Sequence, residues 1–507
     1  MKKNSISKYL LVALCLLQGF GIKAQTLKSA TFNVEPWNLY SLLGNQIDVI
    51  TNLTLTGSIN GYDIRALREM DNLSSLDLTN VKLVAGSNFY VNADISVEND
   101  KIPNYMFYNL NKLTTLALPS SVTSIGNQAL QECTGLTSVI IGNSVTSIGS
   151  FAFGNCSGLS SITIPTSITT ISNQAFWSCT GLTSFTIPGN VTSIGDNAFD
   201  ICTKLKTFTV ADANPNYSSS EGVLFNKDKS VLIAYPNSKS SIYTIPGSVK
   251  TIGNNAFGSC YGLAKVVIGN NVTSIGIGAF YNCNGLVSVS IGSGITAIGK
   301  DVFYNCYNLP SITIPSNVTY IGNNAFGYCA GLTSIDLGKG ITSIDINAFT
   351  NCIGLTSVTI PSGVTSIGDW ALSYCTGLKE LHCKASTPPT VTSSTFYIID
   401  KSACKLYVPI GTSTKYKGSS GWNEFKTIIE EYGTSIPQTE ISSIKVYKDQ
   451  DAIVIEGATI DDKIAVYGIS GSILQSFKAT DEVTRIYLPV NHLYIINISG
   501  KSYKVAL

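Results

Sequence analysis

The stretch that decides the fold is "LTSVIIGNSVTSIGSFAFGNCSG" at residues 136–158, because "LSSITIPTSITTISNQAFWSCTG" at residues 159–181 repeats it at the same length. Cysteines mark a period of 23 residues through two runs of such stretches. A fixed period between about 20 and 50 residues indicates stacked supersecondary units. The sequence therefore predicts a repeat protein. The periodic cysteines are Cys133, Cys156, Cys179 and Cys202, and then Cys260, Cys283, Cys306, Cys329, Cys352 and Cys375.

Within each unit the apolar residues form three groups. The segment "LTSVII" predicts a short strand, and "VTSIG" predicts a second extended segment that ends at a glycine turn. We expect "SFAFGNC" to form one turn of α-helix or 3₁₀-helix that points Ala152, Phe153 and Cys156 inward. One such unit is too small to bury these side chains by itself, so successive units must stack. The predicted fold class is an α/β repeat solenoid.

The first residues, "MKKNSISKYLLVALCLLQGFGIKAQ", predict a secretory signal peptide at residues 1–24. Lysines precede an apolar run at residues 9–21, and the small residue Ala24 marks a cleavage site before Gln25. The run is too short to span a bilayer, and no other segment has about 18 uninterrupted apolar residues. We therefore expect export through the general secretory pathway and no transmembrane segment.

Thirteen cysteines in an exported protein raise the question of disulfides. The ten periodic cysteines follow the buried Ala-Phe pair at a fixed offset, so we expect them to be buried, unbridged thiols that pack as small apolar residues. Cys383 and Cys404 lie outside this periodic set. They are the one pair that the sequence leaves open as a bridge.

The chain divides into several segments on either side of the regular repeats. Residues 25–112 predict an N-terminal cap with degenerate repeats and an amphipathic helix at residues 63–70. Regular repeats occupy residues 113–378, with a hairpin insertion at about 211–240 that either projects from one edge or only patches a coil. A C-terminal cap follows at residues 379–431, with an amphipathic end "GWNEFKTIIEE", and then a linker at 432–440. Residues 441–507 predict a small all-β sandwich domain.

The repeats resemble a known family. "LTSVTIPSGVTSIGDWALSYCTGL" at residues 355–378 is similar to the BspA-like leucine-rich repeats of bacterial surface proteins, and "TPP…LYVPIG…Y…GW" resembles their C-terminal cap. The resemblance covers residues 52–431 and implies a right-handed leucine-rich-repeat coil with 23-residue repeats. It also implies a non-enzymatic, secreted or cell-surface protein that binds other proteins in an adhesin-like manner.

The last domain resembles a second family. "VYGISGSIL" at residues 466–474 and "LPVNHLYIINISGKSYKVAL" at residues 488–507 are similar to the C-terminal sorting domains of type IX secretion substrates. This resemblance implies a final location on the outer surface or outside the cell.

Charge and composition argue against several classes of function. The net charge is +1 and only 13% of the residues are charged, so we expect no nucleic-acid partner. The two histidines, His382 and His492, lie in different domains without nearby cysteines or carboxylates in a metal-site or triad pattern. We therefore predict no catalytic residues, no metal and no cofactor, and a protein that is not an enzyme.

Tyrosines that differ from coil to coil are the candidate ligand-binding residues. Tyr281 and Tyr304 follow the buried Phe in adjacent units, so they should stack on each other. Tyr261 and Tyr307 come just after the cysteine, and Tyr328 comes just before it. Exposed aromatic rings with polar tips are typical anchors for protein partners and for sugar faces.

Two functional interpretations therefore remain. The first is a protein ligand, such as host extracellular matrix or another bacterial surface. The alternative is a glycan-binding surface protein that uses the tyrosine edge. A third interpretation gives the tyrosines no ligand, and their rings then only pack against neighbouring turns.

Overall fold

The computed structural model describes residues 28–86 and 97–431 of the long repeat region, and 445–449, 452–458, 461–469, 471–481, 483–489, 492–498 and 501–506 near the C-terminus. The chain forms two compact units, Met1–Ile429 and Glu430–Leu507. The predicted signal peptide and the predicted linker lie outside the described residues. Within the described part of the chain, no helix is both long and apolar enough to cross a membrane.

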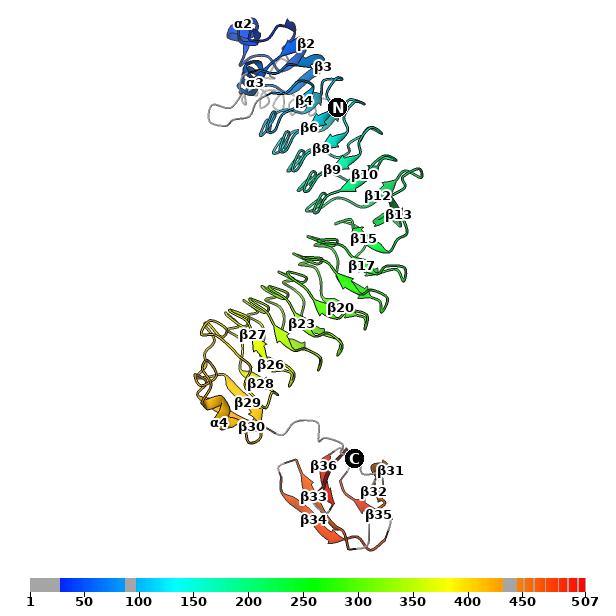
Figure 1. Ribbon diagram of the computed structural model, residues 1–507, viewed down its shortest axis with the longest axis vertical. Helices are drawn as coiled ribbons and strands as arrows, with labels where there is room; N and C mark the ends of the chain where they lie inside the picture. Colours follow the sequence, from blue (N-terminus) through cyan, green and yellow to red (C-terminus); the bar gives the residue numbers. More distant parts are fainter. Residues whose placement is uncertain are drawn as a thin grey trace, which may run out of the picture. The chain divides into compact units, whose positions relative to one another are not determined.

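The first unit is a stack of coils, and each regular coil has three sides (Figure 1). Its first side is a stack of strands, which pair in parallel along the regular coils. Identical repeat positions lie opposite one another, as Phe185 pairs with Phe208. The first stack consists of β1 (Ser29–Val34), β2 (Asn52–Ile59), β3 (Ser75–Leu83), β5 (Thr115–Ala117), β7 (Ser138–Ile140), β10 (Ser184–Ile187), β12 (Thr207–Val210), β16 (Ile242–Thr244), β18 (Lys265–Ile268), β20 (Ser288–Ile291), β22 (Ser311–Thr313), β24 (Ser334–Asp336), β26 (Ser357–Ile360), β28 (Glu380–Cys383), β29 (Lys405–Pro409) and β30 (Thr427–Glu431).

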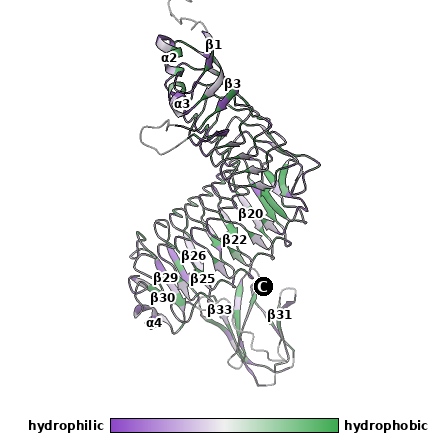
Figure 2. Ribbon diagram, turned by 45° about the horizontal axis from the view of Figure 1, so that its top comes forward, coloured by the Kyte–Doolittle hydropathy of each residue, from purple (hydrophilic) through white to green (hydrophobic). Residues whose placement is uncertain are grey.

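The second side is a stack of two-residue strands from the "TSIG" segments. Within each sheet these strands pair in parallel, and the isoleucine points into the core in most coils, as Ile148 and Ile171 do. A polar residue precedes the isoleucine in most of these strands. Both hydrophobic and hydrophilic residues are found along the coils (Figure 2). These strands are β4 (Lys101–Ile102), β6 (Ser124–Ile125), β8 (Ser147–Ile148), β9 (Thr170–Ile171), β11 (Ser193–Ile194), β17 (Thr251–Ile252), β19 (Ser274–Ile275), β21 (Ala297–Ile298), β23 (Tyr320–Ile321), β25 (Ser343–Ile344) and β27 (Ser366–Ile367).

The third side, here called the turn side, is not helical, so the expected turn of helix is wrong. Two residues of each regular coil have the left-handed backbone conformation, such as Gln128 with φ 57° and Glu132 with φ 66°. A left-handed residue turns its N–H group away from its own coil, and Gln128 donates to the carbonyl of Ser150 in the next coil at 2.8 Å. The turn side is therefore a third ladder of hydrogen bonds between coils. The repeat solenoid itself is confirmed.

Helix is confined to the ends of the described repeat region. It consists of α2 (Leu39–Leu43), the 3₁₀-helix η1 (Gly44–Gln46), α3 (Gly61–Arg68) and α4 (Ser413–Lys417). Helix α3 is the one predicted at residues 63–70, and it begins two residues earlier because Asn60 and Asp63 form a capping box. The C-terminal end "GWNEFKTIIEE" forms turns and β30.

The core is a column of phenylalanine rings accompanied by a column of thiols. Phe303 stacks between Phe280 and Phe326, with ring centroids 5.3 and 5.4 Å apart. The Cys306 thiol donates to the carbonyl of Phe280 at 3.2 Å, and the same contact recurs from coil to coil. Burial raises the pKa of these thiols, to about 12 for Cys179. All twelve cysteines in the described residues are free, as predicted for the periodic ten.

The open question of a bridge between Cys383 and Cys404 is answered by the structure. Both residues are buried free thiols. The Cys383 sulfur accepts a hydrogen bond from the Tyr416 hydroxyl at 3.1 Å.

The hairpin insertion lies within the stack. Strand β14 (Val223–Asn226) pairs antiparallel with both β13 (Tyr217–Ser220) and β15 (Val231–Ala234), and β15 then pairs in parallel with β17 of the second stack. Val223 and Phe225 belong to the core of the C-terminal coils, whereas Leu224 belongs to the core of the N-terminal coils. The hairpin therefore replaces a coil, and a hairpin that projects from one edge is wrong.

The C-terminal unit contains two antiparallel sheets, in agreement with the small all-β domain expected there. One sheet has the order β31 (Lys445–Asp449), β32 (Ala452–Glu456) and β35 (Val483–Tyr487). The other has the order β34 (Ile473–Lys478), β33 (Lys463–Gly468), β36 (Leu493–Ile498) and β37 (Lys501–Ala506). Both sheets contribute to one buried cluster, which includes Ile455, Val466 and Ile496.

Replacement of Phe303 by alanine should destabilise its neighbourhood by about 3–5 kcal/mol, because it removes a fully buried ring from the column. Each coil depends on its neighbours, so hydrogen exchange should increase most at residues 286–332 and little near residue 113. The exposed Thr313→Ala variant in the same coil serves as the control. A uniform loss of protection along the whole stack would contradict the prediction.

The periodic thiols should be unreactive in the native protein, since burial raises their pKa and shields them from reagents. A thiol-specific reagent should therefore detect few thiols before denaturation. It should detect at least the ten periodic thiols after denaturation without reductant. A count near two in the denatured protein would show that the column is bridged.

Candidate binding surface

Tyr281 and Tyr304 lie on the turn side of adjacent coils, as predicted. Their rings are parallel within 5° and their centroids are 5.5 Å apart. The backbone ladder sets this spacing, because the N–H of Asn282, a left-handed residue, donates to the carbonyl of Tyr304 at 2.9 Å. The stacked arrangement is therefore a consequence of the coil geometry, and both rings are partly exposed.

Tyr328 extends this pair by one coil. Its ring lies 5.3 Å from that of Tyr304 at an angle of 56°. Gly327 occupies the position that Tyr281 and Tyr304 have in their coils, and a Cβ atom there would lie 3.2 Å from the Tyr304 ring. The missing side chain leaves room for that ring, and the exposed Tyr328 continues the row. We call Tyr281, Tyr304 and Tyr328 the tyrosine strip.

The other two predicted residues, Tyr261 and Tyr307, are exposed but are not part of this strip. Each comes just after a buried cysteine. Among the described residues, no ring contact joins either of them to the tyrosine strip. The structure thus brings together three of the five predicted tyrosines.

The phenol groups of the tyrosine strip influence one another. Partial burial raises the pKa of the Tyr304 phenol, and the neighbouring Tyr328 and Tyr281 hydroxyls raise it further. Tyr304 is therefore a neutral hydrogen-bond donor and acceptor at physiological pH. Such a surface offers ring faces and hydroxyl groups to a ligand.

A second group of exposed apolar side chains lies on the turn side of the last coils, and its members are not among the predicted ligand-binding residues. Trp370 and Tyr374 each contact Tyr397, with ring centroids 4.9 and 5.6 Å apart. Ile398, next to Tyr397 in the chain, is 50% exposed. We call Trp370, Tyr374, Tyr397 and Ile398 the aromatic cluster.

The backbone of this cluster is unusual. Trp370, Tyr374 and Ile398 have φ values of 60°, 57° and 63°, in the left-handed region that large side chains disfavour. The sequence contains a signal for this unusual backbone, because most equivalent positions carry small polar residues, which tolerate the left-handed conformation. Such residues are Asn255, Asn282, Asn305, Asn324, Asn347 and Asn351.

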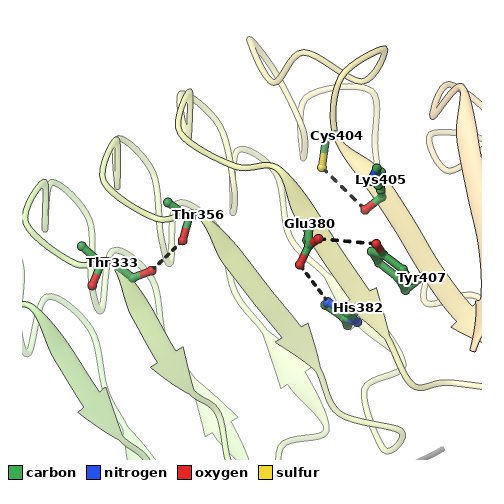
Figure 3. Close-up of polar contacts among 7 residues, drawn as sticks. All are labelled: Thr333, Thr356, Glu380, His382, Cys404, Lys405 and Tyr407. Carbon is green, nitrogen blue, oxygen red and sulfur yellow. Dashed lines mark hydrogen bonds and ion pairs between the residues drawn. The ribbon is translucent and has the colours of Figure 1, made fainter. Parts of the chain in front are cut away.

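The histidine of the repeat region lies on the outward face of the first stack (Figure 3). His382 stacks on Tyr407, with ring centroids 4.4 Å apart, and its Nε2 lies 3.7 Å from the Glu380 carboxylate. In earlier coils the same region carries threonines such as Thr356, whose hydroxyl donates to the carbonyl of Thr333 at 3.4 Å. Within the described residues, no group of three or more His, Cys, Asp or Glu side chains is arranged to hold a metal ion.

A cavity of about 730 Å³ lies where the N-terminal cap meets the first regular coils. It is lined by Arg68, Tyr105, Tyr108 and Lys112, among others. The Arg68 guanidinium donates to the backbone carbonyls of Tyr105 and Tyr108 at 3.1 and 3.2 Å. This arginine therefore joins α3 to the first coil.

Comparison with known protein families identifies the repeats. The BspA type leucine-rich repeat region matches residues 100–222, 233–353 and 296–409, which together cover more than half of the chain. The chain belongs to the BspA-type leucine-rich repeat family. Among curated proteins, none matches this sequence.

Solved structures of similar proteins have TM-scores below 0.5. A leucine-rich cell surface protein from Faecalibacterium prausnitzii is 28% identical, with a TM-score of 0.44, and the match covers 70% of this chain and 83% of that one. A leucine-rich repeat protein from Eubacterium ventriosum is 24% identical, with a TM-score of 0.46 and coverage of 57% and 94%. The pneumococcal vaccine antigen PcpA is 23% identical, with a TM-score of 0.45 and coverage of 80% and 84%.

The left-handed conformation of Ile398 should make Ile398→Asn a stabilising substitution. Asparagine tolerates this conformation, and the exposed isoleucine side chain gains little from burial. We expect the last coils to gain about 1 kcal/mol against local unfolding, measured by hydrogen exchange. Ile353→Asn is the control, because Ile353 is similarly exposed without a positive φ. An equal effect of both substitutions would show that the backbone conformation stores no strain.

Proposed function

We propose that this BspA-type repeat protein is a non-enzymatic, adhesin-like surface protein that binds another protein through the tyrosine strip. The observation that carries the proposal is the continuous row of Tyr281, Tyr304 and Tyr328 across three coils. Tyrosine supplies a large, rigid contact area with a polar tip, and such residues are enriched among the anchors of protein interfaces. The partner belongs to host extracellular matrix or to another bacterial surface.

The position of the strip within the fold supports this function. Side chains that maintain the core repeat in every coil, as the Phe and Cys columns do, and they cannot distinguish one partner from another. The strip differs from neighbouring coils, where the position of Tyr304 is held by Gly258, Gly327 or Thr350. A partner that needs a specific surface would therefore bind where the coils differ.

We further propose that the protein is exported to the outer surface or to the medium. The lysine-rich start and apolar run of residues 1–24 support secretion through the general pathway. The all-β unit at the C-terminus then serves as a sorting domain.

Removal of residues 441–507 should leave the protein inaccessible to protease added to intact cells, while the full chain is degraded. Equal degradation of both proteins would exclude a sorting role.

The double substitution of Tyr281 and Tyr304 by alanine should weaken binding of the protein partner by at least roughly 30-fold. Truncation of a central aromatic anchor typically costs about 2 kcal/mol or more, at about 1.4 kcal/mol for each tenfold change. The full chain would be titrated onto immobilised fibronectin, fibrinogen, laminin and collagen by surface plasmon resonance. Because both rings are partly exposed, the thermal midpoint should change little.

The matched control changes the strand face of the same region. Ser311→Ala with Thr313→Ala removes two exposed hydroxyl groups from β22 and leaves the strip intact. This control should bind as the unmodified protein does. If the tyrosine variant binds normally and the strand variant does not, then the strand face is the binding surface.

A further inference from the structure

The aromatic cluster joins two successive coils near the C-terminal end of the repeat region, where the ribbon changes from yellow to orange (Figure 1). Tyr397 lies between the other two rings and is inclined to Trp370 by 66° and to Tyr374 by 71°. All three rings are exposed. The rings therefore do not form one flat surface. Their inclined faces suit a narrow, chain-like ligand better than a broad, flat ligand.

The backbone conformation indicates that these side chains serve a ligand. Trp370 and Tyr374 occupy left-handed positions, at which Asn347 and Asn351 stand one coil earlier. A large residue there raises the energy of the folded state, and its exposed side chain recovers little of this by burial. Backbone strain of this kind persists mainly where a function requires the residue.

Polar groups flank the rings on the same coils. Asp369 directly precedes Trp370, and its Oδ1 accepts hydrogen bonds from the hydroxyls of Thr392 and Ser394, the latter at 3.0 Å. These hydrogen bonds hold the pKa of Asp369 below its usual value, so the group is a carboxylate at neutral pH. Among the described residues, no hydrogen bond or ion pair engages its Oδ2 atom. That oxygen is therefore available to accept a hydrogen bond from a ligand.

We propose that the aromatic cluster is a binding site for a neutral polysaccharide chain, with sugar rings against Trp370 and Tyr397 and a sugar hydroxyl donating to Asp369. The C–H groups on the face of a sugar ring carry a small positive charge, which is attracted to the negative face of an aromatic ring. A carboxylate accepts hydrogen bonds from hydroxyl groups and repels anionic glycans. Both features match an uncharged sugar.

The small extent of the cluster suits a narrow ligand. It consists of four exposed side chains, which a single polysaccharide chain can cover. Trp370 and Tyr397 are in edge-to-face contact across two successive coils, with ring centroids 4.9 Å apart and planes inclined by 66°. The two rings therefore present differently directed faces to one ligand.

The test measures retardation of the full chain in native gels that contain dextran, mannan, xylan, galactan or mixed-linkage β-glucan. We expect at least one of these polysaccharides to retard the unmodified protein. Trp370→Asn and Tyr374→Asn should each weaken this binding by at least about tenfold. Asp369→Asn should also weaken it, since the amide loses the negative charge that strengthens a hydrogen bond.

Phe151→Asn is the matched control. Phe151 holds the same position in its coil as Trp370, has φ 54°, and contacts Trp177 as Trp370 contacts Tyr397. It should have the same effect on the thermal midpoint as Trp370→Asn and should leave polysaccharide binding unchanged. Thus an effect on binding is separated from an effect on stability.

Three results would overturn the proposal. The first is that none of the five polysaccharides retards the unmodified protein. The second is that the polysaccharides retard the cluster variants as strongly as the unmodified protein. The third is that Trp370→Asn loses binding to an immobilised matrix protein but keeps its binding to the polysaccharide. The tyrosine strip lies on earlier coils, so the double variant of Tyr281 and Tyr304 should still bind the polysaccharide. Failure at one surface is thereby distinguished from failure at the other.

Discussion

The structure depends on the backbone hydrogen bonds that pass from coil to coil on all three sides. On the two strand sides these bonds are the ordinary ladders of parallel strands. On the turn side two residues per coil have the left-handed conformation, and their N–H groups, such as that of Asn282, reach the next coil, as does the N–H of the intervening Phe280. The left-handed conformation explains why small polar residues recur at these two positions, and it makes each large residue there informative.

Much of the repeat region could be predicted from the sequence, since the period of 23 residues and the inward Ala, Phe and Cys positions follow from apolar spacing alone. The stacking of Tyr281 on Tyr304 followed from the same period. The turn side could not be predicted in this way, because apolar spacing does not reveal which N–H groups stay within a coil. For that reason the aromatic cluster is not among the predicted binding residues.

The cysteine column shows how one side chain meets two demands. A small apolar group fits the space beside the phenylalanine rings, and the thiol also donates to a carbonyl of the preceding coil, as Cys329 does to Phe303 at 3.1 Å. Buried carbonyl groups need such partners. Alanine would fill part of the space without donating, and serine would add a more polar group to an apolar column. Cysteine suits both needs, and burial keeps it unreactive.

Strand β14 affects how mechanical tension passes along the repeat region. Its residues alternate between two cores, with Leu224 on one side and Val223 and Phe225 on the other, so the column of stacked rings is interrupted there. Tension applied to the two ends of the repeat region passes along its coils. The phenylalanine column does not cross the interruption. The coils before and after the hairpin are instead coupled by strands β13–β15 and by direct contacts such as the hydrogen bond from Asn254 to Asp196. Tension between the two groups of coils therefore passes through these strands and contacts and not through stacked rings.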